Sequence, residues 1–361
     1  MVMNSPDGSI AYVELYALDA NAAIEYFTRA FAFTLVAHAV HPDRHSFLLA
    51  SGSTRLIVTE SRGGGTVAEW LAAHGDGICD VALYRFDLDG VIERARQARV
   101  LARPPSIDPA TGTLHAKVGG IGAVRHTLLP VDADSTLPPG FNWQHVYSAP
   151  QPAPPALKSI DHIAFCLPAG ALEPTAAIYQ AVFGMQIICT ERTEVGDAAT
   201  NSHVLRDVTG LTFVMLEPDP TRAPGQIDQF LVMNRGAGVQ HLAFMTDDIV
   251  GAVRGYGARG VGFAPAPPAA YYRGLAERVA DAPELRSDLA DLRATGVLLD
   301  RDENGALCQI FTTSPHERNT LFYELVERRG CNGFGTNNVV ALFEARAADL
   351  LARSVPVGSG N

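Results

Sequence analysis

The feature that most constrains the fold is a strand–helix pattern that occurs four times along the 361 residues. Segments 10–33, 75–100, 160–185 and 236–261 each read as an alternating strand, a polar break and an amphipathic helix. Further alternating segments follow each helix, so the repeating unit is βαβββ. Units of this length must pack against one another to bury their apolar faces, which predicts an α+β protein of four such modules.

A proline-rich stretch divides the four modules into two pairs. Residues 147–158 hold four prolines and little that could pack, as is typical of a linker. We therefore expect an N-terminal domain over 1–147 and a C-terminal domain over 158–353, and a frayed tail after Ser354.

Charge and cysteine content exclude several classes of function. The 28 basic and 39 acidic residues give a net charge of −11, which argues against a nucleic-acid footprint and against polybasic membrane binding. The five cysteines form no CxxC pair, so neither a disulfide framework nor a thiolate zinc site is indicated. The N-terminus has no signal-peptide pattern, and no apolar run approaches the ~20 residues of a membrane span. These observations predict a cytoplasmic protein.

Three polar side chains interrupt apolar strand faces in the second half. His162 shares one face with small residues, and His241 occupies the corresponding face of the next module. Glu324 lies between apolar neighbours on a third strand, and the spacings of 79 and 83 residues are nearly equal, as a module repeat requires. Taken singly, each residue is more typical of a satisfied core histidine or an exposed strand glutamate. Together they predict the two-His, one-carboxylate set of a non-haem Fe(II) oxygenase, which leaves positions free for a bidentate substrate and O2.

The first half provides an internal control. Aligning the modules places Tyr12 at the position of His162, Asp80 at that of His241, and Thr127 near that of Glu324. Tyr, Asp and Thr are a poor ligand set for iron. The N-terminal domain is therefore expected to be a scaffold without metal, whose free surface would be available for a homodimer.

Specific motifs support this interpretation. The second half contains, in order, IDHIAFC, NSHVL, PGQIDQFL, GAGVQHLAF, PPAAYY, LCQIFT, LFYELVER and NGFGTNN. In these stretches the chain resembles the 4-hydroxyphenylpyruvate dioxygenase and hydroxymandelate synthase family of the vicinal-oxygen-chelate superfamily. The resemblance implies that each domain is an open, barrel-like curved sheet with outer helices, and that a C-terminal helix closes over the active site.

The resemblance also assigns roles to individual residues. His162, His241 and Glu324 match the iron ligands, and the other matched positions are polar or aromatic groups of the substrate pocket: Ser202, Gln226, Gln240, Gln309, Phe311, Phe322 and Phe334. Strict alternation would turn Gln240 away from the face of His241, so a twist or a bulge is expected there. His203, His316 and Asp161 are expected at the surface or behind the ligands.

Members of this family decarboxylate an aryl-pyruvate oxidatively, so the resemblance implies an Fe(II) dioxygenase that acts on 4-hydroxyphenylpyruvate and O2. Two departures bear on the product. The dioxygenase branch has a Pro-x-Asn-Glu-Pro strand where this chain has Val214 and Leu216 on the inward face, and it has Phe where Val339 enters the final helix. Aliphatic groups at both places would let the ring tilt and present its benzylic carbon to the oxidant. This favours the branch that forms 4-hydroxymandelate for specialised peptide (antibiotic) metabolism.

Three alternatives remain at the level of sequence. One is the branch of the same family that forms homogentisate in tyrosine catabolism. Another is a metal-free binding protein on the same fold, because fold alone does not determine function. The third is an extradiol ring-cleaving enzyme with the same triad, although the Gly-Phe-Gly segment favours the keto-acid family.

Overall fold

The computed structural model describes residues 9–131, 137–145, 157–335 and 338 of the chain. Most of the expected linker, the tail after Ser354 and nearly all of the expected closing helix, including Val339, lie outside the described residues.

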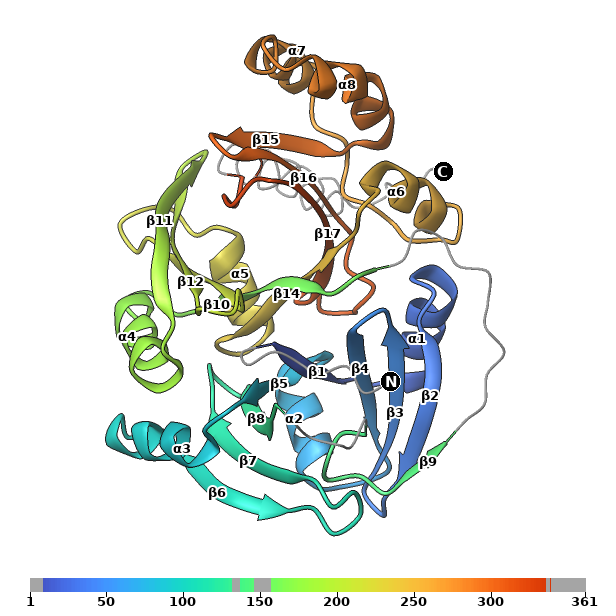
Figure 1. Ribbon diagram of the computed structural model, residues 1–361, viewed down its shortest axis with the longest axis vertical. Coiled ribbons are helices and arrows are strands. Elements are labelled where there is room, and N and C mark those ends of the chain that lie inside the picture. The colour runs from blue at the N-terminus through green and yellow to red at the C-terminus, as the bar shows by residue number, and fades with distance from the viewer. Residues whose placement is uncertain (1–8, 132–136, 146–156, 336–337, 339–361) are drawn as a thin grey trace, which may run out of the picture.

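The first half of the chain forms one curled nine-stranded sheet with helices on its outer side (Figure 1). Its elements in chain order are β1 (Ile10–Tyr16), α1 (Ala20–Glu25), the π-helical turn η1 (Tyr26–Ala30), β2 (Thr34–Val40), β3 (Arg44–Ser51), β4 (Thr54–Ser61), α2 (Thr66–His74), β5 (Gly77–Arg85), α3 (Leu88–Gln97), β6 (Ala102–Ile107), β7 (Leu114–Gly119), β8 (Arg125–Pro130) and β9 (Trp143–His145). The strand order is β6-β7-β8-β5-β1-β4-β3-β2-β9.

The second half forms an eight-stranded sheet in the same manner. Its elements are β10 (Ile160–Cys166), α4 (Leu172–Phe183), β11 (Gln186–Val195), β12 (Ala198–Arg206), β13 (Thr212–Pro218), α5 (Gln226–Met233), β14 (Gly238–Met245), α6 (Ile249–Gly257), α7 (Ala269–Arg278), α8 (Pro283–Thr295), β15 (Leu298–Asp302), β16 (Gly305–Phe311) and β17 (Phe322–Arg329). The strand order is β11-β12-β13-β10-β14-β17-β16-β15.

The expected α+β fold of four βαβββ modules is confirmed. Each module opens with one of the strands β1, β5, β10 and β14, and the two modules of a half join through an antiparallel pair, β1 with β5 or β10 with β14. Polar caps define the helix starts: the side chains of Asp19, Asp87 and Asp248 each accept a hydrogen bond from a backbone N–H three residues on. The repeat pattern did not predict α2, α5 or the pair α7 and α8, which are insertions between module strands.

Each central pair carries two bulges at matching places. In β10 and β14 the register slips around Asp161 and around Gln240, so that each is an extra residue in its strand. The pair β1 and β5 slips at Ala11 and Cys79. The bulge expected at Gln240 is therefore confirmed, and its physical effect is to let two successive side chains turn toward one face of the sheet.

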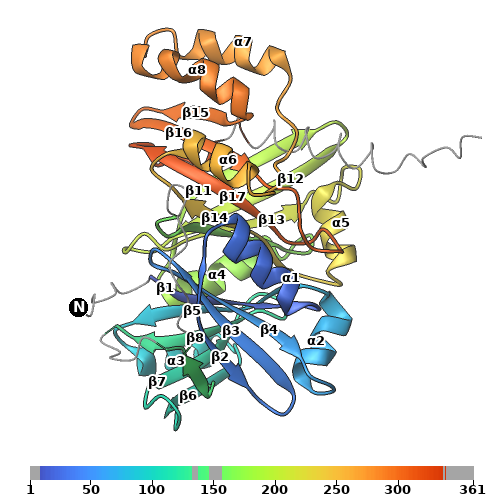
Figure 2. The ribbon, with the colours of Figure 1, turned by 90° about the vertical axis from the view of Figure 1, so that its right-hand side faces the viewer.

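The two halves share an apolar core. One continuous cluster of buried residues draws on both sheets. Helices α3 and α4 pack side by side, and η1 places the ring of Phe31 5.1 Å from that of Tyr256 in α6. Seen from the side, the two sheets are stacked and α7 and α8 lie at the far end of the C-terminal half (Figure 2). Within the described residues, no helix combines the length and apolar character that crossing a bilayer requires.

Candidate active site

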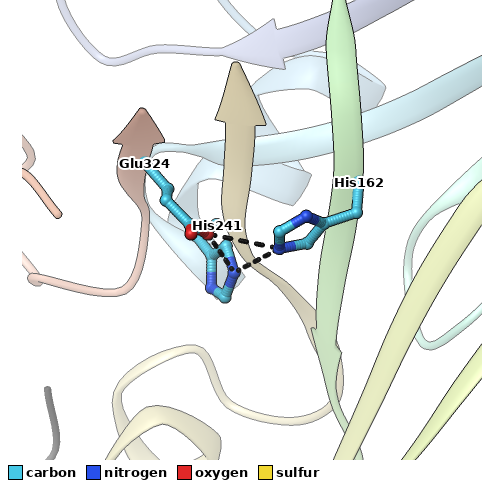
Figure 3. A group of neighbouring side chains, drawn as sticks. All are labelled: His162, His241 and Glu324. Carbon is cyan, nitrogen blue, oxygen red and sulfur yellow. Dashed lines mark hydrogen bonds and ion pairs between the residues drawn. The ribbon is translucent and has the colours of Figure 1, made fainter. Parts of the chain in front are cut away.

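Three neighbouring strands bring the predicted ligands together. His162 comes from β10, His241 from β14 and Glu324 from β17, which are adjacent in the sheet, and all three side chains are buried (Figure 3). His162 Nε2 lies 3.4 Å from His241 Nε2 and 3.2 Å from Glu324 Oε2. His241 Nε2 lies 3.4 Å from the same Glu324 oxygen. The three potential donor atoms thus form a nearly equilateral triangle.

This arrangement fits a divalent transition metal. Ligand atoms bound about 2.1 Å from one ion form triangles of this size. Glu324 Oε2 is buried and forms no hydrogen bond, an arrangement that is costly unless a cation or another partner satisfies it. Two imidazoles and one carboxylate are also the donor set that non-haem iron prefers when other positions stay open.

His162 is oriented from behind by a carboxylate and an arginine. Its Nδ1 lies 2.8 Å from Asp161 Oδ1, and Arg328 donates to both Asp161 oxygens at 2.6 and 2.8 Å. Burial alone would lower the pKa of His162, but the charges of Glu324 and Asp161 outweigh it and raise that pKa to about 9. Although burial opposes it, hydrogen bonding to Arg328 and His162 holds the pKa of Asp161 well below its usual value. A carboxylate behind a histidine fixes its tautomer and ring orientation, as in many metal sites.

Glu324 is fixed by hydrogen bonding to Oε1, the oxygen that does not face the two imidazoles. Gln309 Nε2 donates to Glu324 Oε1 at 2.8 Å, and Asn338 Nδ2 donates to Gln309 Oε1 at 2.8 Å. Tyr271 in α7 in turn donates to Asn338 Oδ1 at 2.9 Å. Burial would raise the pKa of Glu324, but the neighbouring His162 and His241 lower it to about 2, so the carboxylate is ionised near neutral pH. Gln309 therefore fixes one oxygen and leaves the other directed at the two imidazoles.

His241 is fixed by packing. The ring of Phe322 stacks on it with centroids 4.9 Å apart, and the ring of Phe311 meets it edge-on at 6.1 Å. The side-chain oxygen of Gln240 lies 3.2 Å from His241 Nδ1. These contacts leave Nε2 as the ring nitrogen that faces His162 and Glu324.

The triad opens into a cavity of about 610 Å³, including its mouth. Most of the sequence-predicted residues line it: His162, Ser202, Val214, Leu216, Gln240, His241, Gln309, Phe311, Glu324 and Phe334. A mixture of apolar walls with a few polar groups is typical of small-molecule sites.

Two of the predicted pocket residues lie elsewhere, and a third is not described. Phe322 is behind His241 and does not line the cavity. Gln226 is the first residue of α5 and is also absent from the lining. Val339 lies outside the described residues.

Four lining residues were missed by the sequence reasoning. Glu191 and Thr193 come from β11, and Thr200 and Val204 from β12. Alternation along β11 and β12 puts each pair on one strand face, and Glu191 pairs directly with the predicted residue Ser202. That periodicity was a usable signal, because a residue opposite a pocket residue in an antiparallel pair lies on the same face.

His203 and His316, expected at the surface or behind the ligands, are buried, so the surface alternative is wrong for both. His203 Nε2 lies 2.8 Å from Glu173 Oε1. His316 is held between Asp76 of the N-terminal half and the hydroxyl of Tyr323, at 2.9 Å from each. Of the three residues expected at the surface or behind the ligands, Asp161 is the one in contact with a predicted ligand.

Comparison with known proteins gives a consistent result. Residues 159–286 match the family model of the glyoxalase/bleomycin resistance protein/dioxygenase superfamily. The chain is 33% identical over 295 residues to a 4-hydroxyphenylpyruvate dioxygenase of Neurospora crassa, covering 77% of this chain and 70% of the relative. It is 30% identical over 331 residues to the enzyme of that name from Danio rerio, covering 88% and 81%.

A solved structure is more similar over its whole length. A triple-substituted variant of 4-hydroxymandelate synthase from Streptomyces coelicolor superimposes with a TM-score of 0.86 and 42% identity, covering 96% of this chain and 99% of that one. A fusion of a xylose isomerase-like TIM barrel with a 4-hydroxyphenylpyruvate dioxygenase superimposes with a TM-score of 0.69 and 22% identity, covering 96% and 53%, and supports the fold alone.

Proposed function

We propose, from the premise that this chain belongs to the 4-hydroxyphenylpyruvate dioxygenase and 4-hydroxymandelate synthase family, that it is a 4-hydroxymandelate synthase. The reaction would convert 4-hydroxyphenylpyruvate and O2 to 4-hydroxymandelate and CO2. One oxygen atom enters the new carboxylate and the other enters the benzylic position, so atoms and electrons balance without a further reductant.

The observation that carries this choice of product is the aliphatic wall of β13. Val214 and Leu216 line the cavity on one face of that strand, and β13 is the direct neighbour of β10, which holds His162. Leu216 packs in an apolar cluster with Ala164 and Phe230. The side chains of β13 at these two positions offer the ring no hydrogen bond, so nothing on this strand holds the ring away from a pose that turns its benzylic carbon toward the metal. The 42% identity to a 4-hydroxymandelate synthase variant supports the same branch.

His162, His241 and Glu324 are the residues that would hold Fe(II). When bound, the ion would supply the chelation site for the keto acid and the activation of O2. Gln309 and Asp161 orient two of the three ligands, because Gln309 bonds the far oxygen of Glu324 and Asp161 bonds the far nitrogen of His162. The buried position of the triad excludes water from the reaction.

The aromatic and polar lining residues would orient the substrate. Phe311 and Phe334 are in the lining, Phe311 edge-on to His241 and Phe334 edge-on to His162, where they can contact an aryl ring. Glu191 and Ser202 pair across β11 and β12, and β13 separates them from β10. They form the polar wall that would accept a hydrogen bond from the ring hydroxyl.

The test is product analysis. Protein loaded with Fe(II) is incubated with 4-hydroxyphenylpyruvate in air, and the aromatic product is identified by chromatography and mass spectrometry. The proposal expects 4-hydroxymandelate as the main product. Homogentisate as the main product would overturn it in favour of the second candidate, 4-hydroxyphenylpyruvate dioxygenase, which is the name that the curated relatives carry.

A metal-free binding role is disfavoured by the triad itself. A sequestering pocket gains nothing from a buried carboxylate oxygen without a hydrogen bond between two imidazoles. Iron content after anaerobic reconstitution discriminates: about one Fe(II) per chain supports the enzyme, and absence of bound iron supports the binding protein.

A further inference from the structure

We propose that Arg328 is a positioning residue that sets the orientation of the metal ligand His162 and the place of the aromatic wall residue Phe334 together. The inference rests on the proposed function, because it treats these two groups as parts of one catalytic site. It assigns to a single side chain the link between the metal geometry and the position of the substrate ring.

Arg328 is linked to His162 through Asp161. Arg328 comes from β17 and donates from Nε and Nη2 to the two oxygens of Asp161, at 2.6 and 2.8 Å. Asp161 in turn holds His162 Nδ1 at 2.8 Å. The bulge at Asp161 lets two successive residues of β10 meet in this way. Two parallel bonds from a planar guanidinium fix the carboxylate plane, and hence the imidazole plane.

Arg328 is linked to Phe334 through the segment that follows β17. The remaining terminal nitrogen, Nη1, donates to the carbonyls of Gly333 at 2.7 Å and Cys331 at 3.3 Å. The guanidinium also lies over the ring of Phe334, 4.9 Å from its centroid. That ring meets His162 edge-on with centroids 5.6 Å apart. The Gly-Phe-Gly segment is therefore anchored to the group that orients the ligand.

Lysine cannot replace this arrangement. An ammonium keeps the positive charge but is a single point donor, so it cannot hold both Asp161 oxygens and two carbonyls at once. The Arg328 side chain is 15% exposed, so water has little access to the bonds that lysine would leave unmade. The expected consequence is a tilted imidazole and a displaced Phe334 in a protein of unchanged charge.

The experiment compares the wild-type chain with Arg328→Lys. Co(II) is titrated into each metal-free protein, and affinity and the visible ligand-field spectrum are recorded. Loss of groups behind a ligand typically costs 10- to 100-fold in metal affinity, and we expect a loss in that range with an altered spectrum. With Fe(II) and 4-hydroxyphenylpyruvate, we expect the ratio of 4-hydroxymandelate to homogentisate to change as well.

Arg329→Lys is the matched control. Arg329 is the next residue of β17, but it pairs with Glu327 and Asp288, away from the triad. It should leave Co(II) affinity within twofold of wild type. Asp161→Asn is the second variant, and it should weaken Co(II) binding without adding its full effect to that of Arg328→Lys, because both break one chain of contacts.

The outcomes separate this inference from the proposed function. Unchanged Co(II) affinity and spectrum in Arg328→Lys would overturn the inference, whatever product the wild-type enzyme forms. A changed affinity with an unchanged product ratio would overturn the link to Phe334. Homogentisate from the wild-type chain would overturn the proposed function, while a weakened and spectrally altered Co(II) site in Arg328→Lys would still support the positioning of His162.

Discussion

At the place where the C-terminal sheet holds Glu324, the N-terminal sheet holds Thr127, and the two side chains have different environments. The registers establish this equivalence: Ala164 pairs with His241 as Glu14 pairs with Asp80 in the first half. Asp80 in turn pairs with Arg125 as His241 pairs with Phe322, which makes Thr127 the counterpart of Glu324. The same arrangement of strands and bulges therefore holds the triad in the C-terminal half and its counterparts in the N-terminal half.

In the N-terminal half the polar groups satisfy one another. Arg125 donates to Glu14 at 2.6 Å and to Asp80 at 2.9 Å. Thr127 Oγ1 donates to Asp80 at 2.6 Å, and Thr59 Oγ1 donates to Glu14 at 2.8 Å. The carboxylates are paired with a cation that belongs to the chain itself.

In the C-terminal half two of these positions are apolar. Phe322 stands where Arg125 stands in the first half, and Ala164 where Glu14 stands. These positions therefore offer the imidazoles and Glu324 no arginine, and within the described residues one oxygen of Glu324 forms no hydrogen bond. A metal site on this scaffold depends on what is missing around the donors as much as on the donors themselves.

The largest expected effect comes from giving the C-terminal half its counterpart's residue. Glu324→Thr removes the only carboxylate of the triad, and we expect Fe(II) binding and kcat to fall by on the order of 10³-fold. Thr127, the N-terminal counterpart of Glu324, gives the control, because Thr127→Val should leave the iron content unchanged. Iron analysis of the purified proteins and product formation measure both variants. Stoichiometric iron in Glu324→Thr would contradict the assignment of the ligand.

The second effect concerns the internal cation. Arg125→Met leaves Glu14 and Asp80 buried without their charge partner, and breaking a buried pair in this way costs about 3–5 kcal/mol. Denaturant unfolding of the metal-free protein measures the loss. The exposed pair of Arg29 with Glu25 gives the control, because Arg29→Met should change stability by less than about 1 kcal/mol. Equal effects of the two substitutions would mean that the N-terminal network is not stabilised by its cation.

The third effect tests the contact between the halves. His126 of β8 lies 2.7 Å from the hydroxyl of Tyr179 in α4, and burial lowers the pKa of His126 from 6.5 to about 4. In the unfolded chain this histidine takes up a proton as the pH falls below 6.5, whereas the folded protein resists until about pH 4. Stability is therefore lost as pH falls through this window, by about 3 kcal/mol in total.

His126→Gln keeps a group that can bond Tyr179 but does not titrate. Unfolding free energies of the two proteins between pH 4 and 7 should show a steeper acid loss for the wild type. Parallel pH profiles would show that His126 is not held neutral by burial. The equivalent residue of the C-terminal half is Tyr323, which does not titrate in this range, so no matching effect is expected from it.

Periodicity was sufficient to predict the repeat and the triad. Alternation of side chains placed His162, His241 and Glu324 on one face, and the four modules required their strands to be neighbours. The irregularity at Gln240 was expected only once the family resemblance had placed Gln240 in the pocket beside His241, because strict alternation would turn two adjacent side chains to opposite faces.

Groups that act through distant partners could not be predicted in this way. Arg328 and Asp161 are 167 residues apart in the chain, and His316 and Asp76 are 240 apart, so their pairing depends on how strands and halves pack. Glu191 was missed because a charged residue on an edge strand is more typical of a solvated face. The Arg125 network was missed for a related reason, since its members come from β1, β4, β5 and β8 and meet only when these strands pair.

The smallest expected effect concerns one position at which the two halves differ in polarity. Leu216 corresponds to Thr59 of the N-terminal half, since each pairs with the residue two positions after the equivalent residues Ala164 and Glu14. Thr59 uses its hydroxyl to hold a carboxylate, and Leu216→Asn would restore a polar group there that could bond the ring hydroxyl or Ser202. One such hydrogen bond is worth about 1 kcal/mol, which predicts a several-fold rise in the share of homogentisate.

Leu216→Met separates polarity from size, because it keeps the side chain apolar and should leave the product ratio within about twofold of wild type. Both ratios come from chromatography of reactions at equal substrate conversion. If Leu216→Asn and Leu216→Met gave the same ratio, a hydrogen bond at this wall would not control the reaction outcome. The product ratio would then depend on how the substrate ring packs against Phe334, whose position Arg328 fixes. Comparing the product ratios of Arg328→Lys and Arg329→Lys would test that explanation.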